Sequence, residues 1–265
     1  SQPLPTPLPT YLPTPLPTNS PMTPQHTLQI KNTLQIKNTL QIKICGLTRS
    51  DQVQAIAALR PHYLGFICVP QSPRFVTPEQ IQTLTQALPA EVCPVGVFAN
   101  PDLDGLSTTV TVGGLGGIQL HGNESLEFCW DVRRRFPEAF LIKALRIRTA
   151  SDLDLAHTYS GGDAAPIDAL LLDAYHPQQL GGTGETLDWA MLRQFQPPVP
   201  WFLAGGLRPD NVAEALALVQ AQGVDVSSGV ERSPGDKDLD RVAAFLQAVR
   251  QCPQPDREVF PRQKP

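Results

Sequence analysis

Two side chains capable of acid–base chemistry stand at the ends of strand-like segments. Cys45 ends the run LQIKIC, and Asp173 ends the run DALLLD. A thiolate on one side of a pocket and a carboxylic acid on the other could remove a proton from carbon and deliver one to oxygen. A lone cysteine at a strand end is more commonly a small buried residue, so this interpretation requires both strand ends to face one pocket.

Two loops rich in glycine and serine follow two later strand-like segments. LAGGLRPDNV (203–212) places two glycines after one segment, and VDVSSGVERSPGDKD (224–238) places Ser-Ser-Gly after the next. Backbone N–H groups and short hydroxyls bind phosphate, and glycine lets the backbone approach it closely. The loops therefore predict a phosphate site formed by Gly205, Gly206, Ser227, Ser228 and Gly229.

Other polar groups stand at the remaining strand ends. Arg74 in QSPRFV could hold a carboxylate in bidentate fashion or be an ordinary surface arginine. His121, with Gln119 before it, could face the pocket or make a structural hydrogen bond. The GGTGETLDW loop (181–189) is interpreted as a mobile cover beside Asp173 or as a simple turn. No His, Cys or Asp cluster has metal-ligand spacing, and no motif suggests a flavin or nicotinamide cofactor.

Strand-like and helical segments alternate along the chain and would position these residues. Strands are predicted at 40–45, 63–68, 94–98, 117–120, 140–146, 168–173, 201–204 and 224–227. Helical spacing or helix starts lie at 50–59, 77–88, 123–136, 149–159, 188–195, 208–220 and 238–250, while 101–112 is the weakest helix. The alternation predicts an α/β fold, a single (β/α)₈ TIM barrel over residues 39–250, with an open doubly wound sheet as the alternative. In such a barrel, chemistry takes place at the C-terminal ends of the strands.

The first 38 residues form a different kind of sequence. They contain nine prolines in the first 24 residues, and the unit TLQIKN occupies 27–32 and 33–38 and recurs as TLQIKI at 39–44. We expect residues 1–38 to be a disordered low-complexity tail, with a ligand for a proline-reading domain as the alternative. The third copy should form the first strand, because only it continues into the residues that follow. Residues 251–265 are expected to be a C-terminal tail.

Composition narrows the class of protein. The net charge is −4, so there is no global basic field for nucleic acid or an anionic membrane. No apolar run approaches the roughly 20 residues needed to span a bilayer. The five cysteines are odd in number and far apart, which argues against a disulfide framework and favours a reduced, cytoplasmic setting.

The motifs at successive strand ends closely resemble those of the phosphoribosylanthranilate isomerase family. In order along residues 40 to about 248 they read KICGLT, LGFICVPQSPRFV, VGVFAN, IQLHG, IKALR, LLLDAY with GGTGETLDW, LAGGLRPDNV and DVSSGVERSPGDKD. The resemblance implies the Amadori rearrangement of N-(5-phosphoribosyl)anthranilate to 1-(2-carboxyphenylamino)-1-deoxyribulose 5-phosphate, a step of tryptophan biosynthesis that needs no cofactor or metal.

The resemblance also implies roles for individual residues. By motif, Cys45 would be the general base, Asp173 the general acid and Arg74 the group that holds the anthranilate carboxylate. The glycines of AGG and the Ser-Ser-Gly of the last loop would hold the phosphate. Gln119 and His121 are also placed in the substrate site. The expected partner is a small phosphorylated substrate, and the chain is expected to be a monomer or a homodimer.

Two other functions stay open. A related phosphate-binding barrel, such as indole-glycerol-phosphate synthase or a histidine-pathway sugar isomerase, is the nearest enzyme alternative. The synthase would carry catalytic lysine and glutamate at strand ends, whereas here the first strand ends in Cys45 with Lys43 two residues earlier on the same face. A non-catalytic scaffold that binds through its proline tail would have no need of Cys45 and Asp173 on opposite rims.

Overall fold

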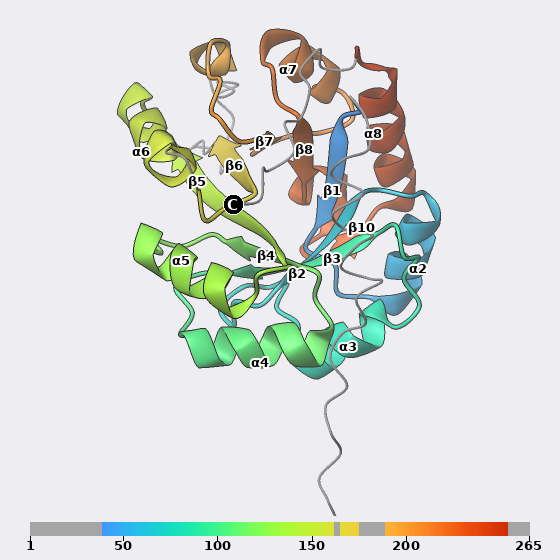
Figure 1. The fold of residues 1–265 in the computed structure, drawn as a ribbon. Helices are drawn as coiled ribbons and strands as arrows, with labels where there is room; N and C mark the ends of the chain where they lie inside the picture. The colour runs from blue at the N-terminus through green and yellow to red at the C-terminus, as the bar shows by residue number, and fades with distance from the viewer. Residues whose placement is uncertain (1–38, 162–164, 175–188, 254–265) are drawn as a thin grey trace, which may run out of the picture.

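The predicted strands form one closed parallel barrel in the computed structural model, which describes residues 39–161, 165–174 and 189–253 (Figure 1). The strands follow one another in chain order, and β8 pairs with β1 to close the sheet. They are β1 (Gln41–Cys45), β2 (Tyr63–Ile67), β3 (Cys93–Phe98), β4 (Gly117–Leu120), β5 (Phe140–Ile147), β6 (Ala169–Ala174), β7 (Trp201–Ala204) and β8 (Gly223–Val226). The closure confirms the barrel and excludes the open doubly wound sheet.

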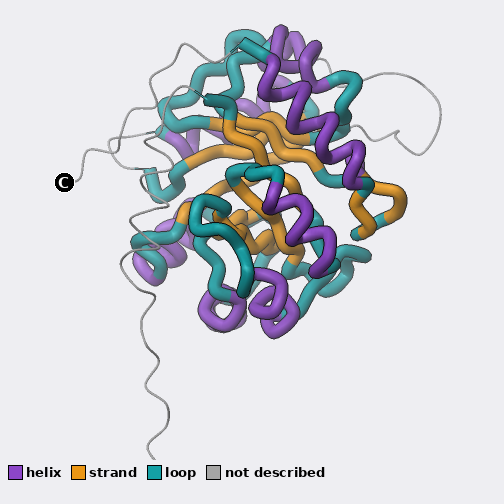
Figure 2. Tube along the Cα trace, turned by 90° about the vertical axis from the view of Figure 1, so that its right-hand side faces the viewer, coloured by secondary structure: helices purple, strands orange, loops and turns teal. Residues whose placement is uncertain are grey.

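Helices surround the barrel on its outer side (Figure 2). They are α2 (Ser50–Ala58), α3 (Pro78–Thr85), α4 (Leu103–Gly113), α5 (Leu126–Arg135), α6 (Ala150–Ser160), α7 (Val212–Leu218) and α8 (Leu239–Gln251). The predicted capping box of α3 is present, because the Thr77 side chain accepts from the Gln80 N–H and the Gln80 side chain accepts from the Thr77 N–H. Side-chain caps also begin α4, α5 and α8, whereas α2 and α7 begin without a side-chain cap hydrogen bond.

Alternation along the strands divides the apolar side chains between two cores. One face packs against the helices, as Ile42 and Ile44 of β1 do. The other face fills the barrel interior with a cluster that includes Tyr63, Phe140 and Phe202, and the Tyr63 and Phe140 rings stack with centroids 5.1 Å apart. These rings come from the first or second residues of their strands. The interior is therefore filled at the N-terminal end of the barrel, and polar side chains occupy the other end.

Two of the connecting segments differ from expectation. Residues 101–112, the weakest predicted helix, form the 11-residue helix α4. Asp102 caps its first turn by accepting from the Gly105 N–H at 2.7 Å, and Gly114 ends it with φ of 62°. The helix predicted at 188–195 is instead a short 3₁₀ helix, η1 (Trp189–Leu192), in the described part of that segment. Pro197 and Pro198 follow closely and prevent a longer helix.

A small hairpin after β8 is absent from the predicted elements. The 3₁₀ helix η2 (Ser228–Val230) leads into β9 (Glu231–Ser233), which pairs antiparallel with β10 (Asp236–Lys237). Pro234 and Gly235 make the turn, and Gly235 has φ of 83°, a conformation that favours glycine. The hairpin is important for function because it brings Glu231 and Lys237 to the rim of the barrel.

The predicted tails fall largely outside the described residues. This applies to residues 1–38 and to all of 251–265 except 251–253. β1 begins in the third copy of the repeated unit, as predicted, and ends one residue beyond it at Cys45, and the first two copies are outside the described residues. Across the described ranges, no helix is long and apolar enough to cross a membrane.

Candidate active site

The pairing register of β1 points its functional side chains into the barrel. Cys45 lies opposite Gly65 of β2, and Lys43 lies opposite Asp225 of β8. Residues 43 and 45 share one face of the strand because side chains alternate, and the intervening Ile44 faces the helices. The end of β1 therefore presents a thiol and, one layer below it, an ammonium group to the interior.

The Cys45 thiol is buried at the C-terminal end of the barrel, with 5% of the residue exposed. A methyl group at residue 65 would lie 2.6 Å from the Cys45 sulfur, so the absence of a side chain at Gly65 makes room for the thiol. Burial raises the pKa of Cys45, and the nearby Lys43 ammonium opposes this rise. A cysteine in this position can accept a proton only if neighbouring charges stabilise its thiolate.

Asp173, at the end of β6, belongs to a chain of hydrogen-bonding groups. The His121 Nε2 lies 3.4 Å from the Asp173 Oδ2, and the Gln119 amide nitrogen lies 2.8 Å from the His121 Nδ1. The amide donates to Nδ1, so the ring proton is on Nε2, which faces the carboxylate. Sequence reasoning assigned Gln119 and His121 to the substrate site, and the structure brings both of them to the predicted acid.

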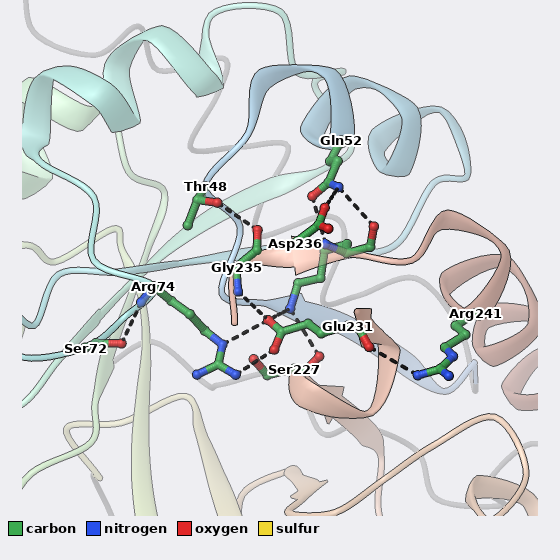
Figure 3. Close-up of polar contacts among 10 residues, drawn as sticks. Thr48, Gln52, Ser72, Arg74, Ser227, Glu231, Gly235, Asp236 and Arg241 are labelled. Atoms are coloured by element: carbon green, nitrogen blue, oxygen red, sulfur yellow. Dashed lines mark hydrogen bonds and ion pairs between the residues drawn. The ribbon is translucent and has the colours of Figure 1, made fainter. Parts of the chain in front are cut away.

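Arg74 is held by a buried carboxylate from the hairpin (Figure 3). Its Nε and Nη2 donate to the two carboxylate oxygens of Glu231 at 2.9 and 2.6 Å. Glu231 also accepts from the Lys237 Nζ at 2.7 Å and from the Gly235 N–H at 3.2 Å. Burial alone would raise the pKa of Glu231, but the hydrogen bonds from Arg74 and Lys237 bring it below its ordinary value. The Arg74 fork is thus fixed along one edge, and within the described ranges no hydrogen bond engages its Nη1.

The loops after β7 and β8 lie against one another. A methyl group at Gly229 would lie 1.9 Å from the Leu207 carbonyl oxygen, so only glycine allows this approach. Gly205 and Gly206 have φ of 86° and 67°, and the Asn211 amide donates to the Gly206 carbonyl at 3.0 Å. The glycines and serines predicted to bind phosphate therefore belong to two adjoining loops at the same end of the barrel.

These loops also approach the arginine. A methyl group at Gly46 would lie 2.6 Å from the Arg74 Cδ and 2.9 Å from the Ser227 Oγ. Gly46 has φ of 81°, which turns the chain sharply after Cys45. The thiol, the arginine and the first serine of the phosphate loop consequently converge around the turn that follows β1.

The basic residues of β5 have different surroundings. Lys143 is buried on the outer face of the strand, and its Nζ donates to the Glu124 Oε2 at 2.8 Å. Glu124 also accepts from the Asn100 and Gly122 N–H groups at 2.8 and 3.0 Å, which ties together the loops after β3 and β4. Lys143 is therefore structural. Arg146 is exposed and lies opposite Asp173 in the register.

Every predicted site residue lies at the C-terminal end of a strand or in the loop that follows. Cys45 and Asp173 are not neighbours, since β7 and β8 separate their strands in the barrel wall. The predicted cover at 181–189 lies outside the described residues, apart from Trp189.

The sequence reasoning missed Glu231, Lys237 and Asp225. A signal for Asp225 was present, because a charge at an inward position of an apolar strand implies a buried partner, as does Lys43 in β1.

Comparisons with known proteins agree with this geometry. Residues 42–248 match the family model described as N-(5'phosphoribosyl)anthranilate (PRA) isomerase. The N-(5'-phosphoribosyl)anthranilate isomerase of Nostoc punctiforme is 53% identical over 207 residues, which cover 78% of this chain and 97% of the relative. That of Acaryochloris marina is 54% identical over 213 residues, covering 78% of this chain and 96% of the relative.

Solved structures show the same fold. Phosphoribosyl anthranilate isomerase from Thermotoga maritima has a TM-score of 0.72 and 32% identity, covering 80% of this chain and 98% of that one. A phosphoribosyl anthranilate isomerase in complex with reduced 1-(o-carboxyphenylamino)-1-deoxyribulose 5-phosphate has a TM-score of 0.69 and 30% identity, with the same coverage. From the family match over most of its length and from relatives of this identity, the chain belongs to the N-(5'-phosphoribosyl)anthranilate isomerase family.

Proposed function

We propose that this isomerase converts N-(5-phosphoribosyl)anthranilate to 1-(2-carboxyphenylamino)-1-deoxyribulose 5-phosphate with Cys45 as general base and Asp173 as general acid. The observation that carries the proposal is that a buried thiol at the end of β1 and a carboxyl group at the end of β6 lie at the same end of the barrel. Both face the mouth of a barrel whose last two loops adjoin one another as a glycine- and serine-rich rim.

The reaction begins with opening of the sugar ring. Asp173 gives a proton to the furanose ring oxygen, the bond from C1 to that oxygen breaks, and the anilino nitrogen supplies its electron pair to form a protonated Schiff base. The Cys45 thiolate then removes the proton from C2, and the electron pair of the broken C–H bond forms the C1–C2 double bond of an enolamine. Tautomerisation adds a proton to C1 and removes one from the C2 hydroxyl. The conversion consumes no net proton and needs no external oxidant.

Arg74 is suited to hold the anthranilate carboxylate. Two of its nitrogens are fixed by Glu231, so the guanidinium plane is set before substrate arrives. A pre-positioned fork loses little freedom on binding a second carboxylate. The phosphate at the other end of the substrate would be bound by Gly205, Gly206, Ser227, Ser228 and Gly229.

Gln119 and His121 are proposed to act on the acid rather than on the substrate alone. The Nε2–H of His121 faces the Asp173 carboxyl group at 3.4 Å. Such a contact would hold one carboxyl oxygen and leave the other free to carry the proton for the sugar ring. Gln119 would keep the ring in the required tautomer through its 2.8 Å contact with Nδ1.

Three further points concern the oligomeric state, the cellular compartment and the binding partner. All the proposed side chains come from one chain, so a monomer and a homodimer would each carry complete sites. The described residues, which include all five cysteines, contain no disulfide, which supports a reducing, cytoplasmic setting. The expected partner is the phosphorylated substrate alone.

The decisive experiment is turnover of phosphoribosylanthranilate generated in situ. We expect the full chain to be active and Cys45→Ser and Asp173→Asn each to lose about 10²- to 10⁴-fold in kcat. Both variants should still bind the reduced product analogue, measured by titration calorimetry. Cys252→Ser is the matched control, because Cys252 lies at the end of α8, away from the barrel mouth.

The outcomes separate the activity from the residue assignments. A folded full chain without turnover would refute the isomerase activity. Activity in the full chain that survives in Cys45→Ser or in Asp173→Asn would refute only the role of that residue. Loss of analogue binding together with turnover would show that the substitution disrupts the site as a whole.

A further inference from the structure

Lys43 is a fully buried charge that the reaction scheme does not use. Its side chain is 0% exposed, and its Nζ donates to the Asp225 Oδ1 at 2.8 Å. An ammonium group has three donors, and removing it from water is unfavourable unless its surroundings compensate. A hydrophobic side chain of similar volume could fill the same space in the barrel, so a buried charge at residue 43 suggests a role other than packing.

The ammonium group lies next to the proposed base. A methyl group at residue 65 would lie 2.6 Å from the Cys45 sulfur and 3.1 Å from the Lys43 Nζ. Both atoms therefore border the same small space, which Gly65 leaves open. The register explains the arrangement, since Lys43 and Cys45 alternate onto one face of β1 while Gly65 and Asp225 stand opposite them on β2 and β8.

Among the cations near Cys45, Lys43 lowers the pKa of the thiol most strongly. The remaining titratable groups that face the sulfur from neighbouring elements are Asp225, Cys68, Arg74 and Lys237. Arg74 and Lys237 are both bonded to Glu231, as Lys43 is to Asp225. Lys43 lowers the pKa of the Cys45 thiol more than Lys237 does, whereas the Asp225 carboxylate acts in the opposite direction and raises it.

We propose that Lys43 is a positioning residue for the general base: oriented by Asp225, its ammonium group stabilises the thiolate of Cys45 across the space that Gly65 leaves open. The proposal rests on Cys45 being the base of the proposed function. Asp225 keeps Lys43 charged, because burial alone would lower the Lys43 pKa and the carboxylate outweighs this. After C2 deprotonation the ammonium stays protonated, so it holds no proton that the reaction must return.

The test is the pH titration of the Cys45 thiol itself. In the pair variant Lys43→Met/Asp225→Asn, the midpoint should move upward, because loss of the Lys43 ammonium, which lowers the Cys45 pKa, outweighs loss of the Asp225 carboxylate, which raises it. The titration is followed by the ultraviolet absorbance of the thiolate as a difference from Cys45→Ser, and by the pH dependence of alkylation of the Cys45 peptide. The ascending limb of kcat/KM against pH should move by the same amount, so that activity recovers at alkaline pH.

A second buried ion pair provides a matched control. Lys143 and Glu124 are bonded at the same 2.8 Å distance, but on the outer face of β5. The variant Lys143→Met/Glu124→Gln removes an equivalent pair and should leave the Cys45 midpoint where it is in the unaltered protein. A shift of similar size in this control would overturn the proposal, because it would show that loss of any buried pair disturbs the site. An unshifted midpoint in the Lys43 variant, with turnover lowered equally at every pH, would also overturn it.

A measurement on the unaltered chain covers the case in which the pair variant does not fold. With lysine labelled with ¹⁵N, the Lys43 Nζ resonance should shift as Cys45 titrates, and this shift should be absent in Cys45→Ser. A resonance that does not respond to Cys45 would overturn the proposal. The thiolate absorbance, the alkylation and the Lys43 resonance do not depend on turnover, so the proposed base role of Cys45 and the proposed role of Lys43 can fail separately.

Discussion

The base and the acid of this site are held by opposite means. Cys45 is 5% exposed and lies among charged groups, chiefly the pair of Lys43 with Asp225. The Asp173 side chain is 28% exposed, and its neighbour His121 is bonded to the neutral amide of Gln119. The thiol side of the barrel mouth is buried and lined by ion pairs, whereas the acid side is partly exposed, and its contacts run from the Asp173 carboxyl group through His121 to the Gln119 amide.

The difference follows from what each group must do. A thiol in a buried site forms a thiolate only where fixed cations replace the lost water. A carboxyl group that still reaches solvent needs mainly to be oriented toward the oxygen that it protonates. Substitutions on the base side should therefore have large effects that depend on pH, and substitutions around the acid should have smaller ones.

The largest expected effect in this comparison comes from closing the space beside the thiol. In Gly65→Ala the new methyl group would lie 2.6 Å from the Cys45 sulfur and 3.1 Å from the Cys45 Cα, so the thiol must move. Displacement of a catalytic group by about an ångström can reduce turnover about 10²-fold. We expect a loss of this size in kcat, measured with saturating substrate, and weaker reactivity of the Cys45 thiol.

Gly114→Ala is the control for this glycine substitution. Gly114 ends α4 with φ of 62°, and no atom lies within 4 Å of the position of a new methyl group. It should lower the free energy of unfolding by about 1 kcal/mol through backbone strain while leaving kcat unchanged. Equal loss of kcat in both variants would mean that Gly65 serves folding and not the thiol.

A smaller effect, confined to binding, is expected for Arg74→Lys. Lysine keeps the charge but loses the fork that contacts Glu231 with two nitrogens. We expect KM to rise about 10- to 100-fold with little change in kcat, in keeping with the free energy of a bidentate charged contact. Competitive inhibition by an analogue without the anthranilate carboxylate should be the same for both proteins.

Arg49→Lys tests whether any arginine substitution near the barrel mouth has this effect. Arg49 is about half exposed and pairs with Asp51 and Asp236 at the surface. Surface pairs contribute little, so KM should stay constant. If Arg74→Lys also left KM constant, the carboxylate-binding role of Arg74 would be wrong.

On the acid side, His121→Leu should produce a milder loss. The substitution removes one hydrogen bond to Asp173, so we expect kcat to fall about tenfold with KM nearly unchanged. The exposed His157 gives the control, since His157→Leu alters a histidine on α6 outside the proposed site. A rise in KM with constant kcat would instead support the substrate-binding role that sequence reasoning assigned to His121.

The strands were readily predicted from the sequence, and the reason is physical. Strands buried on both faces read as short apolar runs, and the predicted bounds of β4 and β7 equal the observed ones. The positions of Cys45 and Asp173 followed from the strand count alone, because parallel strands in a barrel all end at one rim.

The ionic half of the site could not be predicted in this way. Lys43 and Asp225 are 182 residues apart in the chain, and their contact depends on closure of the barrel between β1 and β8. The hairpin that carries Glu231 has strands of three and two residues, too short to show any alternation. Local patterns thus locate groups on the rim but do not reveal which of them neutralise one another.

The smallest effect on activity is expected from substitution of His62, which contacts β1, the strand that carries Cys45. Its Nδ1 accepts from the Ile42 N–H of β1 at 3.0 Å, and burial lowers its pKa from 6.5 to about 4. The unfolded chain therefore binds a proton more readily than the folded one between these values. Stability that is present above pH 6.5 should fall as the pH drops toward 4, by at most about 3 kcal/mol.

The contribution of His62 to the pH dependence of the free energy of unfolding can be measured separately. His62→Gln can keep an acceptor for Ile42 without titrating, so its free energy of unfolding in urea should fall less over this pH range than that of the unaltered protein. The exposed His157→Gln should follow the unaltered protein. Since acidic residues titrate equally in all three proteins, the difference between the unaltered protein and His62→Gln reports His62 alone. Parallel curves of the free energy of unfolding against pH would show that the contact of His62 with β1 contributes nothing to the pH dependence. Turnover near neutral pH should be alike in all three, because there the His62 ring is already neutral.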